Sequence, residues 1–185
     1  MQILNSAADY RGAPCAVAMG MFDGMHMGHK TLIERTRAEA LKMGAPLVVY
    51  TYAEHPLRVL RPEIAPTTLM RPEEKVRIMA EMGVDAVVMN RFTPETAQTP
   101  AEEFLRSLCR DLKPVVLAAG FNHSFGYKGQ GNADMLRKMA GELGYKALIL
   151  EPVERDGGPV SSSRIRMLLQ EGRFQEAERL LGREE

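Results

Sequence analysis

The amino-acid sequence predicts an α/β fold: a Rossmann-like, doubly wound parallel sheet of five strands with helices on both faces and at the C-terminal end. Three observations support this prediction. Short apolar runs alternate with longer segments of helical periodicity, the apolar runs lack the in–out alternation of a half-exposed sheet, and glycines close three helical segments. Because crossover connections between parallel strands are almost always right-handed, few other topologies remain.

Five short apolar runs are the predicted strands. Each is nearly continuous in hydrophobicity, as expected for a strand that helices cover on both faces. The runs are residues 15–19 (CAVAM), 47–52 (LVVYTY), 86–89 (AVVM), 115–119 (VVLAA) and 147–150 (ALIL).

Segments of helical periodicity separate these strands, and two more follow the last strand. Gly44, Gly83 and Gly144 are expected to end three of the helices, and Gly172 separates the final pair. The predicted helical segments are residues 29–44, 71–83, 100–112, 132–144, 162–171 and 174–181.

The overall composition excludes several classes of protein. The length of 185 residues, with 45% hydrophobic and 26% charged residues, fits one globular domain over residues 1–185. Lys plus Arg and Asp plus Glu each total 24, so the formal net charge is zero. A balanced charge argues against a general nucleic-acid binder or a binder of acidic membranes.

The N-terminus and the cysteines predict a cytoplasmic location. The first residues, MQILNSAADYRGAP, lack the basic segment and apolar stretch of a signal peptide. No apolar run approaches the roughly 18 residues of a membrane helix. Cys15 and Cys109 match no metal-binding spacing and are interpreted as buried small side chains, although their even number leaves a disulfide open.

The strongest chemical signal is GMFDGMHMGHK, residues 20–30, which follows the first predicted strand and leads into a helix. Backbone N–H groups and the helix dipole at such a helix start attract phosphate, and glycines allow close approach. The segment is not a Walker A loop, because the GKS or GKT ending is absent, and it is not a dinucleotide fingerprint, because Gly20, Gly24 and Gly28 are spaced differently from G-x-G-x-x-G. His26 and His29 add donors for charge that develops on a phosphoryl oxygen; a metal pair or local capping groups are the alternatives.

Three later segments follow strands or precede a helix. In residues 159–172 (PVSSSRIRMLLQEG), serines at a helix start and Arg166 one turn inside predict a triphosphate clamp, with a plain serine cap as the alternative. Residues 118–132 (AAGFNHSFGYKGQGN) predict a mobile aromatic lid that stacks on a planar ring, or a turn-rich connection. Residues 51–62 (TYAEHPLRVLRP) predict a surface loop that proline stiffens.

Taken in order, these segments resemble the FMN adenylyltransferase module of prokaryotic bifunctional riboflavin kinase/FMN adenylyltransferases, the FAD synthetases. The HxGH motif alone marks only the wider nucleotidyltransferase superfamily, whereas the combination is much more specific. The likeness runs from about Cys15 to Arg183 and includes Lys75 and the stretch Phe92-Thr93-x-Glu95. Its motifs are Gly20-x-Phe22-Asp23-Gly24-x-His26-x-Gly28-His29, Thr51-Tyr52-x-x-His55-Pro56, Gly120-x-Asn122-x-x-Phe125-Gly126 and Val160-Ser161-Ser162-Ser163-x-Ile165-Arg166.

The resemblance implies a nucleotidyltransferase fold that transfers AMP from ATP to FMN, giving FAD and pyrophosphate, with Mg²⁺ held mainly by the ATP phosphates. It implies in-line attack without a covalent intermediate, with His26, His29 and Arg166 as catalytic residues. The implied flavin-binding residues are His55, Pro56, Asn122 and Phe125. The implied ATP-binding residues are Gly20, Phe22, Asp23, Gly24, His26, Gly28, His29, Gly120, Asn122, Ser161, Ser162, Ser163 and Arg166.

Two departures from the family pattern leave alternatives open. The family usually reads T-F-E-P-H-P where this chain has Ala53 and Glu54 in the middle, so another phosphorylated acceptor, CTP, or a non-catalytic flavin- or nucleotide-binding relative remain alternatives. The family usually continues into a riboflavin kinase domain, which this sequence lacks, and we expect either a naturally standalone module or a shortened one. The expected partners are the small-molecule substrates ATP and FMN, and neither nucleic acid nor membranes; no oligomeric state is predicted.

Overall fold

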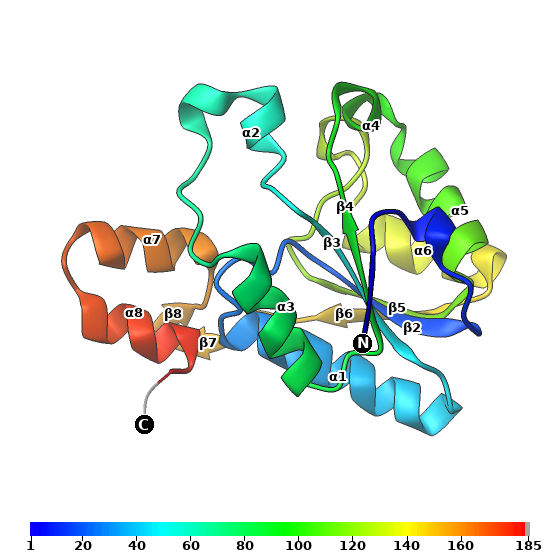
Figure 1. Ribbon diagram of the computed structural model, residues 1–185, viewed down its shortest axis with the longest axis horizontal. Helices are drawn as coiled ribbons and strands as arrows, with labels where there is room; N and C mark the ends of the chain where they lie inside the picture. Colours follow the sequence, from blue (N-terminus) through cyan, green and yellow to red (C-terminus); the bar gives the residue numbers. More distant parts are fainter. Residues whose placement is uncertain (184–185) are drawn as a thin grey trace.

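A parallel sheet of six strands organises residues 1–183, the part of the chain that this computed structural model describes (Figure 1). The strand order across the sheet is β1-β4-β3-β2-β5-β6. The strands are β1 (Gln2–Leu4), β2 (Cys15–Met19), β3 (Leu47–Tyr52), β4 (Ala86–Asn90), β5 (Pro114–Gly120) and β6 (Lys146–Leu150).

The predicted fold class is confirmed, with one strand more than the five that the sequence predicts. The added strand, β1, pairs in parallel with β4 at the edge of the sheet, from Gln2 opposite Ala86 to Leu4 opposite Val88. It has only 3 residues, of which two are exposed, so it carries almost no hydrophobic pattern. Its partner lies far along the chain, and local periodicity therefore could not reveal it.

Eight α-helices connect or follow the strands in the described part of the chain. Three elements were not predicted from the sequence. The short helices α2 and α4 and the hairpin of β7 (Glu154–Arg155) with β8 (Gly158–Pro159) were not expected. The helices are α1 (Met27–Met43), α2 (Leu57–Leu60), α3 (Pro72–Glu81), α4 (Pro94–Gln98), α5 (Ala101–Leu112), α6 (Ala133–Leu143), α7 (Ser162–Gln170) and α8 (Phe174–Leu181).

Three glycines act at helix ends as predicted. Gly44 and Gly144 cap α1 and α6 in the left-handed conformation, at φ 61° and 77°. Gly83 lies one residue beyond Met82, the cap of α3, and has φ 76°. The chain therefore turns from each of these helices into the next strand without backbone strain.

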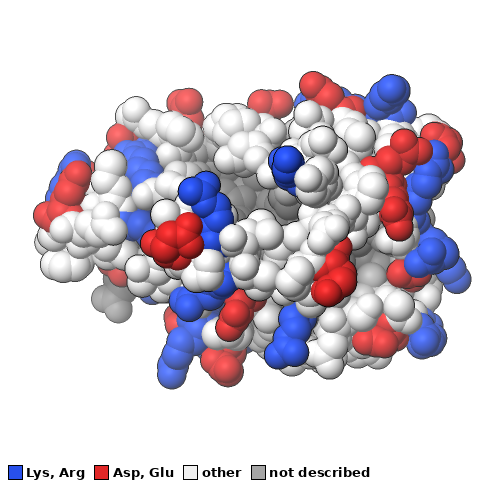
Figure 2. Space-filling view, turned by 90° about the horizontal axis from the view of Figure 1, so that it is seen from above, with Lys and Arg blue, Asp and Glu red and all other residues white. Residues whose placement is uncertain are grey.

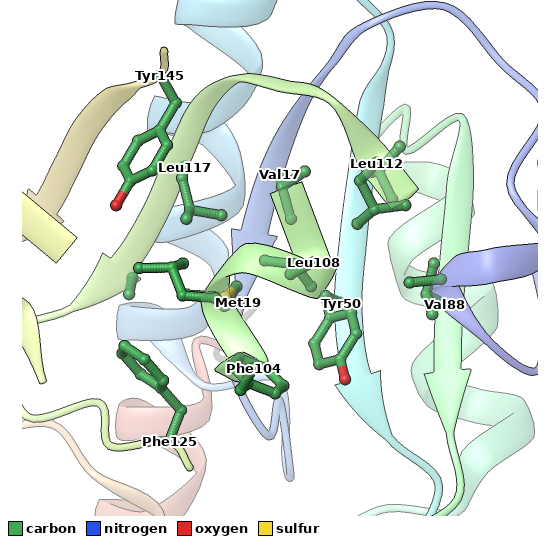
Figure 3. Close-up of a cluster of buried hydrophobic side chains, with 14 of the residues drawn as sticks. Val17, Met19, Tyr50, Val88, Phe104, Leu108, Leu112, Leu117, Phe125 and Tyr145 are labelled. Carbon is green, nitrogen blue, oxygen red and sulfur yellow. The ribbon is translucent and has the colours of Figure 1, made fainter. Parts of the chain in front are cut away.

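The core has two layers, one on each face of the sheet, and Figure 1 shows α1 and α6 on opposite sides of it. Helices α5 and α6 cover one face, and α1 and α3 cover the other. Successive side chains of β2 enter different layers: Val17 and Met19 enter the first, and Ala16 and Ala18 the second. This alternation explains why the whole strand is apolar. Figure 3 shows the first layer, where Phe104, Leu108 and Leu112 of α5 pack over strand residues that include Val17, Met19 and Tyr50.

The last two helices, α7 and α8, form a small core of their own beside the sheet (Figure 1). Ile165 and Leu180 are fully buried between them. Lys30 of α1 donates to the main-chain carbonyls of Leu181 and Gly182, at 3.0 Å each, where cations are favoured at the C-terminal end of a helix. This contact joins the C-terminal helices to the start of α1.

The strand order reverses between β2 and β5. From β2 the chain fills β3 and β4 on one side, and then crosses to β5 and β6 on the other. Met19 and Ala119 are paired at the carboxyl ends of these two strands, so the loops that follow them start side by side. Ligands of open α/β sheets bind at such a switch point.

The two cysteines are free thiols. Cys15 is fully buried and donates to the Leu112 carbonyl, whereas Cys109 is half-buried. Burial raises the pKa of Cys15 to about 12 and that of Cys109 to about 11, which makes both thiols unreactive at neutral pH. Within residues 1–183, no helix has the length and apolar composition needed to cross a membrane.

Candidate functional site

A cleft of about 700 Å³ opens at the carboxyl ends of the parallel strands. Figure 2, seen from above, shows the hollow among mostly uncharged residues, with Lys and Arg side chains beside it. The loops after β2, β3, β5 and β6 contribute its walls, together with the start of α7. The cleft therefore lies at the switch point of the sheet.

The structure brings nearly all the predicted site residues to this cleft. The residues that line it include Gly20, Asp23, His26, Gly28, His29, His55, Pro56, Gly120, Asn122, Phe125, Ser161, Ser162, Ser163 and Arg166. Phe22 and Gly24, both expected to bind ATP, do not line it. The Phe22 side chain is fully buried in the core, and Gly24 packs against Leu69 and Leu181. These two residues support the turn beneath the cleft.

His26 and His29 form a stacked pair at the start of α1. His26 is the N-cap of the helix, and its Nδ1 accepts the His29 N–H at 3.3 Å. The two rings lie 3.6 Å apart, with an angle of 14° between their planes. A Cβ on Gly28 would lie 3.3 Å from the His26 ring and would crowd it, so a glycine at this position leaves room for the imidazole.

Both imidazoles are held neutral at neutral pH. Burial lowers the pKa of His26 to about 4, and the Arg166 charge lowers it further, against a backbone hydrogen bond that raises it. Burial also lowers the pKa of His29 well below its ordinary value, with smaller contributions from His26 and Lys75. The accepting role of His26 Nδ1 leaves its proton on Nε2.

One nitrogen of the pair has no hydrogen-bond partner. Among the buried side-chain nitrogen and oxygen atoms of residues 1–183, His29 Nδ1 is the atom left unsatisfied. Buried polar atoms normally have a protein or water partner, and exceptions concentrate at functional sites. The unsatisfied nitrogen thus marks this pair as a place for a ligand or an ordered water.

Arg166 reaches the histidine loop from the far end of the chain. Its guanidinium forms an ion pair with Asp23 and donates through Nε to the Thr67 carbonyl at 2.7 Å. The Ser162 hydroxyl donates to the Asp23 carbonyl at 2.9 Å. These contacts bring segments 139 residues apart into one cluster. We call His26, His29, Ser162, Ser163 and Arg166 the polar cluster.

The start of α7 has a capping serine and main-chain N–H groups that are unpaired within the helix. Ser161 is the N-cap, and its hydroxyl accepts the Arg164 N–H at 3.2 Å. Ser162 and Ser163 are the first residues of the helix, where main-chain N–H groups have no partner within the helix. The serine cap is thus present, and Ser162, Ser163 and Arg166 also line the cleft, so the cap does not exclude the predicted triphosphate clamp.

Aromatic rings from four segments form a second cluster in the cleft. Tyr52 of β3 meets Phe92 edge to face, with ring centres 5.2 Å apart. Phe104 of α5 lies 5.4 Å from Phe125 and 5.8 Å from Tyr50. Such tilted and edge-on contacts are the favoured geometries of aromatic pairs. We call Tyr50, Tyr52, Phe92, Phe104 and Phe125 the aromatic cluster.

Main-chain hydrogen bonds tie the glycine-rich loop after β5 to itself and to the segment before α5, which fits the turn-rich connection that the sequence left open beside a lid. Phe125 and Gly131 exchange main-chain hydrogen bonds of 3.1 and 2.9 Å, and the Tyr127 N–H donates to the Thr99 carbonyl at 2.6 Å. A Cβ on Gly131 would lie 2.3 Å from the Phe125 ring, and one on Gly126 would lie 2.3 Å from Ala101. The glycines therefore permit close packing of the loop against the ring and against α5.

His55 and Pro56 line the cleft, whereas the residues before them do not. His55 Nδ1 accepts the Leu57 N–H at 3.2 Å. Burial lowers the pKa of His55, and Arg166 lowers it further, which places this imidazole near the polar cluster. Ala53 and Glu54, which depart from the pattern of the resembling family, are absent from the residues that line the cleft.

Several cleft residues were missed from sequence alone. Residues 151–153 form a wall of the cleft at the carboxyl end of β6. Their position directly after a predicted strand was the available signal, but the segment singled out on this side of the strand began at residue 159. Tyr50 lies near the carboxyl end of the buried strand β3 and was interpreted as a core residue alone, although it also borders the cleft.

Comparison with known families identifies one match. The family described as FAD synthetase matches residues 9–164 of the chain. A bifunctional riboflavin kinase/FMN adenylyltransferase of Escherichia coli (strain K12) is 31% identical over 186 residues, which cover 98% of this chain and 59% of that protein. A protein named FAD synthetase, from Listeria monocytogenes, is 31% identical over 167 residues, which cover 90% of this chain and 68% of that protein.

A solved structure agrees with the fold. A protein of Streptococcus pneumoniae described as a macrolide-efflux protein superposes with a TM-score of 0.85 at 28% sequence identity. The superposition covers 98% of this chain and 61% of the other. The chain thus spans about three fifths of the length of the bifunctional relatives it matches.

Proposed function

Since the chain belongs to the FAD synthetase family, we propose that it transfers AMP from ATP to FMN and releases pyrophosphate, giving FAD. One observation carries this proposal: a single cleft holds both a cluster of phosphate-type donors and a cluster of aromatic rings. The first suits a triphosphate and the second suits a planar heteroaromatic ring.

The polar cluster would bind the triphosphate and stabilise the transition state. The FMN phosphate would attack the α-phosphorus of ATP in line, with pyrophosphate leaving on the opposite side. His26 Nε2–H and His29 would donate to oxygens on which negative charge increases. Because both imidazoles are neutral in the free protein, bound phosphates would raise their pKa values and draw protons onto them.

Arg166 would close on the leaving pyrophosphate together with the start of α7. Asp23 and the Thr67 carbonyl hold its guanidinium in place, so little conformational freedom would be lost when a phosphate binds. The hydroxyls and free N–H groups of Ser162 and Ser163 would complete the anion site. In this arrangement the protein contributes positioning and charge stabilisation and forms no covalent bond.

The aromatic cluster would hold the isoalloxazine ring of FMN. Tyr52 and Phe92 are the half-buried members of the cluster, and Tyr50, Phe104 and Phe125 are buried behind them. A small phosphorylated acceptor would leave the exposed parts of Tyr52 and Phe92 in contact with water, whereas a flavin would cover them. The departures Ala53 and Glu54 lie outside the cleft lining, and so they do not argue against a flavin. His55 and Pro56 line the same cleft and would contribute to the acceptor side of the site.

Mg²⁺ belongs to this proposal as the companion of ATP. Residues 1–183 contain no group of three or more His, Cys, Asp or Glu side chains arranged to hold a metal. Asp23 and Glu151 are the carboxylates that line the cleft, and Asp23 is paired with Arg166. This set fits an ion that is bound mainly through substrate phosphates and keeps several waters. Bound there, Mg²⁺ would offset phosphate charge.

A coupled assay tests the proposal. The chain is incubated with Mg²⁺, ATP or CTP, and a panel of acceptors that includes FMN, riboflavin and non-flavin phosphate monoesters. Pyrophosphate release and FAD formation are measured together. We expect pyrophosphate and FAD only when ATP is the nucleotide and FMN is the acceptor. Pyrophosphate release with another acceptor but not with FMN would contradict the flavin assignment. Flavin binding without turnover under any nucleotide would indicate a non-catalytic relative.

A further inference from the structure

Lys75 is a buried lysine that the proposed reaction does not use. It lies on α3, is 6% exposed, and points its ammonium beneath the cleft. The ammonium donates to the main-chain carbonyls of Met21, at 3.3 Å, and Tyr52, at 3.2 Å. A lysine this deeply buried is unusual, because removing its charge from water is costly.

One carbonyl lies in the turn that leads to the polar cluster, and the other belongs to a residue of the aromatic cluster. Met21 begins the turn that leads to His26, and Tyr52 is a member of the aromatic cluster at the end of β3. Lys75 therefore joins, through one ammonium group, the loop that presents the histidines and the strand that presents an aromatic ring.

The turn after Met21 needs outside support. Phe22, Gly24 and Met25 all have left-handed backbones, at φ 53°, 82° and 45°. This conformation is strained for phenylalanine and methionine, and such residues persist only where the surroundings hold them. The buried Thr51 hydroxyl also donates to the Met21 carbonyl, at 3.1 Å. Two buried donors thus fix the first carbonyl of a strained turn.

Lys75 also acts on the histidines through its charge. Its ammonium contributes to the lowered pKa of His29, which lies on α1. Burial lowers the pKa of Lys75 to about 8, against the Asp23 carboxylate in the turn, which raises it. The ammonium is therefore largely charged at neutral pH.

We propose that Lys75 is a positioning residue of the adenylyl-transfer site, whose ammonium ties the Met21 and Tyr52 carbonyls and so sets the histidine pair relative to the aromatic cluster. This inference rests on the proposed function. It does not require that Lys75 touch either substrate.

Steady-state kinetics of three variants form the first test. Lys75→Met keeps the length of the side chain and removes the ammonium, Lys75→Arg keeps a cation of different shape, and Lys138→Met changes an exposed lysine on α6 as the control. We expect Lys75→Met to lower kcat for FAD formation at least about tenfold and to raise KM for FMN, because small misplacements of reacting groups have large effects on rate. Lys75→Arg should be intermediate, and Lys138→Met unchanged. A folded Lys75→Met with wild-type kcat and KM overturns the proposal.

Histidine NMR of the free protein is the second test, and it needs no turnover. The chain has 4 histidines, so their ring signals can be followed individually against pH. Lys75→Met should raise the pKa of His29, and Lys138→Met should leave it unchanged. An unchanged His29 titration in Lys75→Met overturns the proposal. If the wild type forms no FAD and His29 still responds, the proposed function fails while the link from Lys75 to the histidine stands.

Lys75→Met could fail to fold, and thermal melting would show this. In that case Lys75→Arg decides: several-fold lower kcat supports the proposal, and wild-type kcat overturns it. Thr51→Val adds a check, since it is nearly isosteric and removes the other donor to the Met21 carbonyl. A kcat several-fold below wild type is expected there, and an unchanged kcat would contradict the role of the Met21 carbonyl.

Discussion

The polar cluster and the aromatic cluster share one cleft but are built in different ways. The polar cluster joins the start of α1 to the start of α7 through directional contacts, such as the Asp23–Arg166 ion pair and the bond from Ser162 to the Asp23 carbonyl. The aromatic cluster comes from the middle of the chain and is held by ring packing at centre distances of 5.2 to 5.8 Å.

This difference predicts different responses to substitution. When one member of a buried, hydrogen-bonded cluster is removed, its partner is left without a hydrogen bond. The loss of activity should therefore be abrupt. Packed rings lose contact area in proportion to the atoms removed, so the loss of binding affinity should be graded. Within the proposed reaction, the polar cluster should control the rate and the aromatic cluster should control the affinity for the acceptor.

The largest effect is expected from His29→Ala. This change removes one ring of the stacked pair and, in the proposed reaction, one donor to the transferred phosphoryl group. Loss of a single transition-state donor typically lowers kcat by about 10²–10³-fold. FMN affinity, measured by quenching of flavin fluorescence, should change little. A variant that keeps more than about a tenth of the wild-type kcat would contradict the assigned role of His29.

Asp23→Asn should give the next largest effect. The substitution keeps the shape but removes the charge that pairs with Arg166, whose side chain is only 15% exposed. We expect kcat/KM for ATP to fall about 10–100-fold, in line with the loss of a partly buried charge partner. Asp134→Asn is the matched control, because it breaks an exposed pair with Arg137 that should be worth little. Equal effects of the two substitutions would argue against a special role for Asp23.

The histidine pair should also make the fold acid-sensitive. In the folded protein the pKa of His26 is lowered to about 4, and that of His29 is lowered too, against an ordinary value near 6.5. Burial also lowers the pKa of His123 to about 4 and lowers that of His55, so these two side chains add to the effect of the pair. Between these values the unfolded chain binds more protons than the folded one, so the free energy of unfolding falls as pH falls from about 6.5 towards 4. Each such histidine contributes about 2 kcal/mol between pH 6.5 and pH 5, so urea unfolding at pH 7 and pH 5 should differ by on the order of 4 kcal/mol from this pair alone. His29→Ala should reduce this difference in unfolding free energy. An undiminished difference would mean that other titrating groups cause the acid sensitivity.

The sequence predicts the polar cluster well because its chemistry is local. His26 and His29 stand at a helix start, and Ser162 and Arg166 are spaced within one helical turn, so each half could be recognised from a short motif. The strands of the sheet interior were predicted for the same reason, since their apolar runs are continuous.

The remaining features depend on contacts between distant segments. Asp23 was expected at the nucleotide, but its partnership with Arg166 follows only from the fold. The close packing of Gly131 under Phe125 could not be distinguished from a flexible loop in the sequence. Lys75 matched the family pattern, yet nothing near it in sequence indicates that it contacts Met21 and Tyr52.

The smallest effect, and the sharpest test of the comparison, is expected from Phe92→Leu. This change keeps an apolar side chain but removes the edge-to-face contact with Tyr52. An aromatic pair contributes about 0.5–1.5 kcal/mol beyond its buried area, which corresponds to a rise of roughly 2- to 13-fold in KM for FMN. The kcat should stay within about twofold of wild type, because leucine leaves the polar cluster untouched. Phe174→Leu, at an exposed position on α8, is the control. If Phe92→Leu lowered kcat as strongly as KM rises, the two clusters would not divide rate and affinity between them, and the rings would instead help to align the attacking phosphate.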